Sequence, residues 1–156
     1  MLKAKYITGS SLLLENHNDI DQVWFYETKE ESREALIKGE RQSDINIHFD
    51  YVRPLKVFLG CYIYHFMKLI EGEDLHLDEF NIFDHEEEYK ELLRRYVSWL
   101  PHESKKWYHI ITAYYLFKNK SYDLTEAQLK VIQSTHDKGI TNAKYNLCIE
   151  WLGVVS

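Results

Sequence analysis

The hydrophobic period of this 156-residue chain changes near residue 53. Residues 43–51 alternate between apolar and polar side chains, the pattern of a half-buried strand whose polar face is acidic. From Pro54 onward, apolar residues recur every three or four positions, as on one face of a helix. We therefore expect an α+β protein with a small mixed sheet in residues 1–53 and a helical bundle in residues 54–156. No linker separates the two parts, so we expect them to pack as one compact unit.

Local signals predict the individual elements. Strands are expected at residues 3–7, 20–28 and 43–51, and a short polar helix or loop at residues 30–38 that Gly39 would end. Helices are expected at residues 54–69, 84–100, 104–118, after Thr125 and at residues 141–152. The run Thr125-Glu126-Ala127-Gln128 has the form of a capping box, a strong start signal for a helix.

The charge balance restricts the partners. The chain has 19 Lys and Arg against 25 Asp and Glu, a net charge of −6. Binding along an extended nucleic acid requires clustered basic residues, so we expect no such track. The acidic balance is compatible with binding one end of an RNA, or a nucleotide held through a metal ion.

The cysteines and apolar stretches indicate a cytoplasmic protein. Cys61 and Cys148 are far apart and lack the spacing of a zinc site, so we expect buried, reduced thiols. The longest apolar stretch, residues 57–67, is shorter than the roughly 20 residues that a membrane span requires. We expect neither a signal peptide nor a membrane segment.

Asp19-Ile20-Asp21 is the pattern that most suggests chemistry. On a strand, residues i and i+2 point to the same side, so the two carboxylates would project together while Ile20 enters the core. Paired carboxylates suit Mg²⁺, which also binds water and phosphate oxygens. A third carboxylate from residues 43–51 would complete a two-metal site. The candidates are Asp44 and Asp50, with His48 between them.

Gly9-Ser10 precedes this pair and suggests a phosphate site. Glycine allows the backbone to approach a phosphate closely, and the hydroxyl of Ser10 is a further donor. If residues 11–15 form a helical turn, the free N–H groups at its start would bind an anion facing Asp19 and Asp21.

These residues resemble a known family. The stretch "GSSLLLENHNDIDQVWFYE" resembles the signature of the DNA polymerase β-like nucleotidyltransferase superfamily, in which a Gly-Ser pair precedes Asp-x-Asp on the next strand. "DINIHFDYVRPLKVFL" is similar to the strand of that family that carries its third carboxylate. "KKWYHIITAYYLFKNKSYDLTEAQLKVIQSTHDKG" resembles the helical region that follows the catalytic head in small bacterial and phage members.

The resemblance implies Mg²⁺-dependent transfer of a nucleoside monophosphate from a nucleoside triphosphate to a hydroxyl group. It assigns the metal ions to Asp19, Asp21 and Asp44, with Asp50 as the rival third carboxylate, and the triphosphate to Gly9, Ser10 and Ser11. The third carboxylate would also deprotonate the acceptor, which could be an RNA end, a protein or a small molecule.

Three residues of the helical region, Lys105, Lys106 and His109, are further candidates for contact with the nucleotide. In the resembling enzymes, basic residues of the helical part reach the triphosphate. The alternative is a solvated helix start, although cations there are disfavoured by the helix dipole. His48 is either a base or metal-site neighbour, or a hydrogen-bonded histidine of the strand.

Two other functions fit the same sequence. The first is a catalytically degenerate module of the same fold that binds nucleotides or inhibits a partner protein. The second is a helical interaction protein whose acidic surface meets a basic partner.

Overall fold

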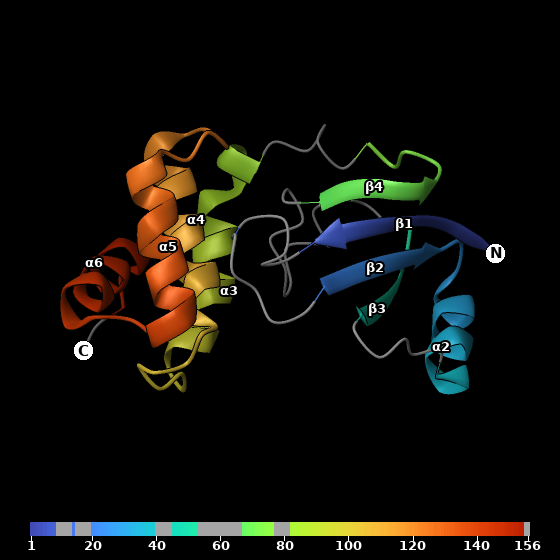
Figure 1. Ribbon diagram of the computed structural model, residues 1–156, viewed down its shortest axis with the longest axis horizontal. Coiled ribbons are helices and arrows are strands. Elements are labelled where there is room, and N and C mark those ends of the chain that lie inside the picture. Colours follow the sequence, from blue (N-terminus) through green and yellow to red (C-terminus); the bar gives the residue numbers. More distant parts are fainter. Residues whose placement is uncertain (9–13, 15–19, 40–44, 53–66, 77–81, 155–156) are drawn as a thin grey trace. The chain divides into compact units, whose positions relative to one another are not determined.

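The computed structural model describes residues 1–8, 14, 20–39, 45–52, 67–76 and 82–154 (Figure 1). These residues form two compact units, a sheet unit up to residue 76 and a helical unit from residue 82. The predicted α+β class, with a small mixed sheet followed by helices, is confirmed. The division falls later than the predicted boundary at residue 53, because a fourth strand belongs to the sheet unit. Close packing of the helical region on the sheet stays a prediction.

Four strands form the sheet in the order β3-β2-β1-β4. They are β1 (Leu2–Thr8), β2 (Ile20–Tyr26), β3 (Ile45–Tyr51) and β4 (Met67–Gly72). β1 is antiparallel to both of its neighbours, whereas β2 and β3 are parallel. Parallel neighbours need a crossover connection, and α2 (Lys29–Lys38) lies in the chain between them.

The predicted strands and most of the predicted helices are confirmed, with ends that shift by a few residues. The helical unit contains the short 3₁₀ helix η3 (Ile82–His85) and the helices α3 (Glu86–Val97), α4 (Trp107–Asn119), α5 (Glu126–Lys138) and α6 (Asn142–Leu152). Thr125 and Gln128 form the predicted capping box at the start of α5. Gly39 ends α2 with a φ of 62°, a conformation that glycine adopts at little cost.

The predicted helix at residues 54–69 is wrong for its last part, because Met67–Gly72 is a strand. Met67 and Leu69 pack against the sheet core, and the intervening Lys68 is exposed. Phe66 and Leu69 are three positions apart in the sequence, which also fits one face of a helix, so the apolar period could not separate a strand from a helix over so short a run. Residues 53–66 lie outside the described part of the chain.

A hydrophobic core lies on one face of the sheet. Ala4, Tyr6, Val23 and Phe25 are buried there, with Met67, Leu69 and Leu75 packed against them. The rings of Tyr6 and Phe25 meet edge to face at 5.7 Å. The hydroxyl of Tyr6 accepts a hydrogen bond from the backbone N–H of Leu75 at 2.8 Å, which fixes the segment after β4 against this core.

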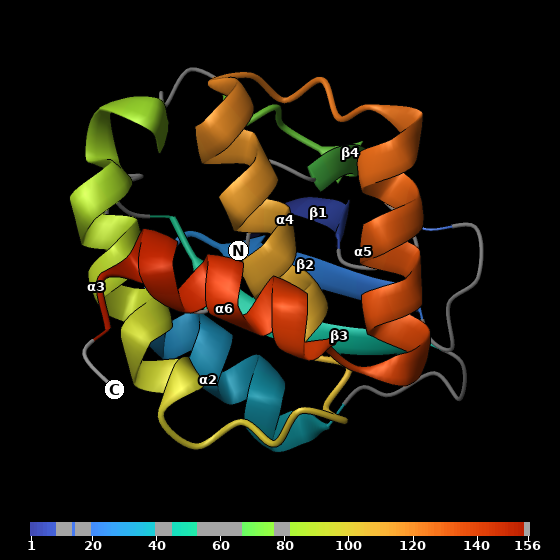
Figure 2. The same cartoon turned by 90° about the vertical axis from the view of Figure 1, so that its left-hand side faces the viewer.

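The helical unit is built around α4, which is buried at almost every position from Trp107 to Phe117. It contacts α5 and α6, and α6 also contacts α3 (Figure 2). The indole N–H of Trp107 donates to the Pro101 carbonyl at 3.0 Å, so the largest buried side chain of the unit has a partner for its polar atom. Among the described residues, every helix is too short or too polar to cross a membrane.

Candidate functional site

Asp21 is the second residue of β2 and pairs with Thr8, the last residue of β1. The Thr8 side chain is buried. Gly9, Ser10 and Ser11 follow Thr8 directly in the sequence, and these three residues lie outside the described part of the chain, as does Asp19. The structure therefore describes the last residue before the predicted phosphate segment and one of the two predicted metal-binding carboxylates, side by side in the sheet.

The predicted orientation of Asp21 is wrong in one respect. Residues alternate along β2, so Asp21 shares a face with Val23 and Phe25, which is the core face of the sheet. Ile20 lies on the opposite face with Trp24 rather than in this core. Val23, Trp24 and Phe25 are all apolar and buried, so β2 lacks an alternation of apolar and polar residues at these positions. Without that alternation, the sequence does not indicate which face of β2 holds this core.

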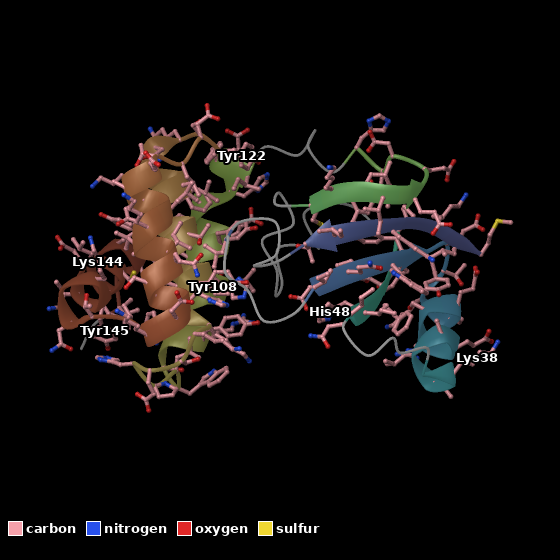
Figure 3. The ribbon with its side chains drawn as sticks, in the orientation of Figure 1. Lys38, His48, Tyr108, Tyr122, Lys144 and Tyr145 are labelled. Carbon is pink, nitrogen blue, oxygen red and sulfur yellow. The ribbon has the colours of Figure 1, made fainter. Side chains whose placement is uncertain are left out.

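The side chain of Asp21 lies next to that of His48. In the parallel register, Asn46 of β3 stands opposite Asp21 and His48 stands opposite Val23, so Asp21 and His48 are diagonal neighbours on one face. His48, which is labelled in Figure 3, has its Nε2 3.6 Å from Asp21 Oδ1, and the two side chains are 36% and 26% exposed. A carboxylate and an imidazole are both metal ligands, and here both are partly open to solvent.

Asp50 lies on the same face but further along β3. Asp50 stands opposite Phe25, whereas Asn46 stands opposite Asp21. Asp50 is thus four residues further along β3, a distance of about 13 Å at the usual rise of a strand. Asp50 Oδ1 accepts a hydrogen bond from the backbone N–H of Tyr51 at 2.8 Å. Its rival, Asp44, lies outside the described residues.

No three His, Cys, Asp or Glu side chains within the described ranges lie close enough together to hold a metal ion. Asp21 and His48 supply two potential ligands. Because Asp19 and Asp44 lie outside the description, the predicted carboxylate triad remains a prediction.

Lys105, Lys106 and His109 belong to the helical unit. Both lysines are exposed and come just before the start of α4, and Lys106 Nζ lies 5.9 Å from the centre of the Trp99 ring. His109 is half-buried, with its ring 4.0 Å from that of Tyr108. Contact of these residues with a nucleotide stays a prediction.

Two features were not anticipated from the sequence. His136 is a buried histidine whose Nδ1 lies 3.0 Å from Asp137 Oδ1, and the hydrogen bond between them lowers the pKa of Asp137.

The second feature is an open cavity of about 470 Å³ on the sheet face opposite Asp21. It is lined by Lys5, Gln22, Trp24, Ile45, Ile47, Ile70 and Glu71. Its location depends on the strand register, which local sequence patterns do not specify.

No protein-family model, curated protein or solved structure matches the chain.

Proposed function

We propose that the protein is a Mg²⁺-dependent nucleotidyltransferase that transfers a nucleoside monophosphate from a nucleoside triphosphate to a hydroxyl group. The observation that carries this proposal is the pairing of Thr8 with Asp21. Gly9-Ser10, which suits a triphosphate, follows the first of these residues, and Asp19 is two positions before the second. The register of β1 and β2 thus favours a phosphate segment and metal-binding carboxylates at one end of the sheet.

The proposed metal ligands are Asp19, Asp21 and Asp44. Asp44 directly precedes Ile45, and Ile45 pairs with Ile20, the residue after Asp19. Asp50 is less suitable because it stands about 13 Å along β3 from the position opposite Asp21, whereas two catalytic metal ions are roughly 4 Å apart. The register therefore favours Asp44 as the third carboxylate.

His48 has a supporting role in this proposal. Its Nε2 lies 3.6 Å from Asp21 Oδ1, close enough to favour one orientation of the carboxylate. Partners of this kind commonly fix the geometry of metal ligands. His48 is thus proposed as a positioning residue that acts through Asp21.

In the proposed reaction, Asp44 accepts the proton of the acceptor hydroxyl as its oxygen attacks the α-phosphorus. A new P–O bond forms on one side of the phosphorus while the bond to the leaving pyrophosphate breaks on the other. Asp19, Asp21 and Asp44 would hold the Mg²⁺, which would supply positive charge to offset the negative charge of the phosphates. Gly9, Ser10 and Ser11 would hold the triphosphate. We place this activity in the cytoplasm, where nucleoside triphosphates are its substrates and Mg²⁺ its cofactor.

Thermal unfolding tests this function directly. A ligand that binds only the folded state raises the melting temperature, so each of the four nucleoside triphosphates should be tested with and without Mg²⁺. We expect a Mg²⁺-dependent increase for the wild type and none for Asp19→Asn/Asp21→Asn. A matched double variant in the helical unit, Asp84→Asn/Asp123→Asn, removes the same charge and should retain the increase. No increase with any nucleotide would contradict the proposal.

A second candidate is a nucleotide-binding module without catalysis. One observation favours this module. Within the described residues of β3, the side chain that approaches Asp21 is the imidazole of His48 rather than a carboxylate. This module would show the same Mg²⁺-dependent thermal increase but would release no pyrophosphate with RNA, protein or small-molecule acceptors. Asp44→Asn would then leave nucleotide binding and biological function intact.

A further inference from the structure

A short segment of the helical unit is basic, although the chain as a whole is acidic. Residues 94–106 include four basic residues, Arg94, Arg95, Lys105 and Lys106, against one acidic residue, Glu103. The segment joins the end of α3 to the start of α4 and is drawn in yellow-green to yellow in Figure 1. This local excess of positive charge contrasts with a net charge of −6 for the whole chain.

The same segment exposes a large aromatic ring. Trp99 is 60% exposed, whereas Trp107 and Trp24 are buried. The Tyr96 ring lies 5.9 Å from that of Trp99, and Lys106 Nζ lies 5.9 Å from the Trp99 ring centre. An indole with this exposure has contact area for another planar group, because its neighbours cover only part of it.

Three basic residues of this segment are available to an anion, and one of them, Lys106, lies next to Trp99. Lys105 and Lys106 are exposed, and across the described part of the chain neither has a carboxylate within ion-pair distance. Arg95 meets Glu91 at 4.0 Å, but both side chains are more than two-thirds exposed, so this contact contributes little. Arg94 is excluded from the set because it already contacts Glu87 and the Leu152 carbonyl.

We propose that Arg95, Tyr96, Trp99, Lys105 and Lys106 form a binding surface for a short single strand of nucleic acid, here named the Trp99 surface. A base would stack on the exposed indole, and the flanking phosphates would contact the three cations. Stacking platforms beside positive charge are how proteins bind single strands with little sequence preference. Duplexes keep their bases stacked internally and so gain little from the indole.

A membrane fits this surface less well. Binding to a lipid surface requires a wide apolar face, and the segment around Trp99 in the sequence also carries the exposed residues Ser98, Pro101 and Glu103. A single ring matches a single base better than it matches a bilayer. If the protein is a nucleotidyltransferase, the bound strand would be the acceptor, and only this last step rests on the proposed function.

Fluorescence anisotropy with a labelled oligouridylate of six nucleotides tests the binding, with no Mg²⁺ or nucleoside triphosphate and at low salt. The oligothymidylate of equal length separates RNA from DNA as the source of the strand. We expect Trp99→Ala to weaken binding by roughly 5- to 160-fold, the usual effect of removing the ring under one stacked base, and Trp99→Phe to retain most of the affinity. Lys105→Ala/Lys106→Ala should lower the salt dependence, by a slope of about 0.7 for each phosphate that the variant no longer neutralises.

The matched control is Lys68→Ala/Lys130→Ala, which removes two exposed lysines outside the Trp99 surface. This control and Asp21→Asn should both bind like the wild type, so a failed catalytic site would leave the result unchanged. The proposal is overturned if the strand does not bind, if Trp99→Ala binds equally well, or if a duplex competes equally. Binding to phosphatidylserine vesicles but not to the oligonucleotides would also overturn it and identify a membrane surface instead.

Discussion

His48 Nε2 lies 3.6 Å from Asp21 Oδ1, on one face of the parallel pair of strands β2 and β3. Asp50 is on the same face, but it stands opposite Phe25 rather than near Asp21. The two aspartates are both candidate carboxylates by sequence, and the sheet register makes them unequal. This difference gives a test in which two similar substitutions have opposite expected outcomes.

Asp21→Asn should remove the Mg²⁺-dependent stabilisation by nucleoside triphosphate, whereas Asp50→Asn should preserve it. A ligand at 100 times its Kd stabilises the folded state by about 2.7 kcal/mol, and a 100-fold weaker Kd reduces this to about 0.4 kcal/mol. The measurement is thermal unfolding of both variants at one fixed ligand concentration. The assignment of Asp21 would be wrong if Asp21→Asn kept the full ligand-induced increase in melting temperature. It would also be wrong if Asp50→Asn lost this increase while Asp21→Asn kept it.

His48→Ala should weaken Mg²⁺ binding by about 10- to 100-fold if His48 positions Asp21, which is the usual effect of removing a group that orients a metal ligand. Because His48 is partly exposed, the substitution should leave the unfolding curve without ligand almost unchanged. A Mg²⁺ titration at saturating nucleotide measures the effect. His85→Ala is the control, since it removes a comparable contact of a histidine with Glu88 far along the sequence.

The elements with strong local signals were predictable from the sequence. The Thr125 capping box specifies the start of α5, and the alternation in residues 45–51 specifies β3, because both patterns depend on neighbouring residues only. The identity of Asp21 and His48 as candidates also came from local pattern. Their proximity did not, because it depends on which residues of two separate strands are paired.

Two predictions failed for reasons of this kind. Val23, Trp24 and Phe25 are all buried, so the sequence of β2 does not show which of its faces holds the sheet core. Met67–Gly72 was too short for its period to distinguish a strand from the end of a helix. In both cases the outcome is determined by packing against β1, which brings together residues distant in the sequence.

The buried thiol of Cys148 predicts a decrease in stability at alkaline pH. Burial raises its pKa from 9.0 to about 12, partly offset by nearby Lys144. Below pH 9 the thiol is protonated in both states and its contribution to stability is complete. Above pH 9 the unfolded chain ionises while the folded protein stays protonated, so unfolding is favoured by up to about 1.4 kcal/mol per pH unit.

Urea unfolding of the wild type and of Cys148→Ala between pH 8 and pH 10.5 measures this dependence. We expect the wild type to lose more stability over this range than Cys148→Ala, whatever the cost of the substitution at pH 8. Cys61 is present in both proteins, so its titration cancels in the comparison. If the free energy of unfolding fell equally with pH in both proteins, the Cys148 thiol would ionise as easily in the folded protein as in the unfolded chain.

Gly72 at the end of β4 tests the strand that the sequence did not predict. Its φ is +93°, and a Cβ atom there would lie 2.9 Å from Ala4 Cα and closer still to the Lys3 carbonyl oxygen of β1. Gly72→Ala should therefore destabilise the sheet unit through both the positive φ and the clash with β1. Gly39 also has a positive φ, of +62°, but a Cβ atom there would meet only the Ile37 carbonyl oxygen at 4.0 Å.

Gly39→Ala should thus show only the backbone cost, about 1 kcal/mol, and Gly72→Ala should add about 1–3 kcal/mol for overpacking. Urea unfolding gives the total decrease in stability, and amide hydrogen exchange of residues 3–7 localises it. Exchange should accelerate in Gly72→Ala and not in Gly39→Ala, because β1 hydrogen-bonds β4 directly. Equal decreases for the two variants would mean that β4 does not pack against β1 at Gly72, and the sheet would then end at β1.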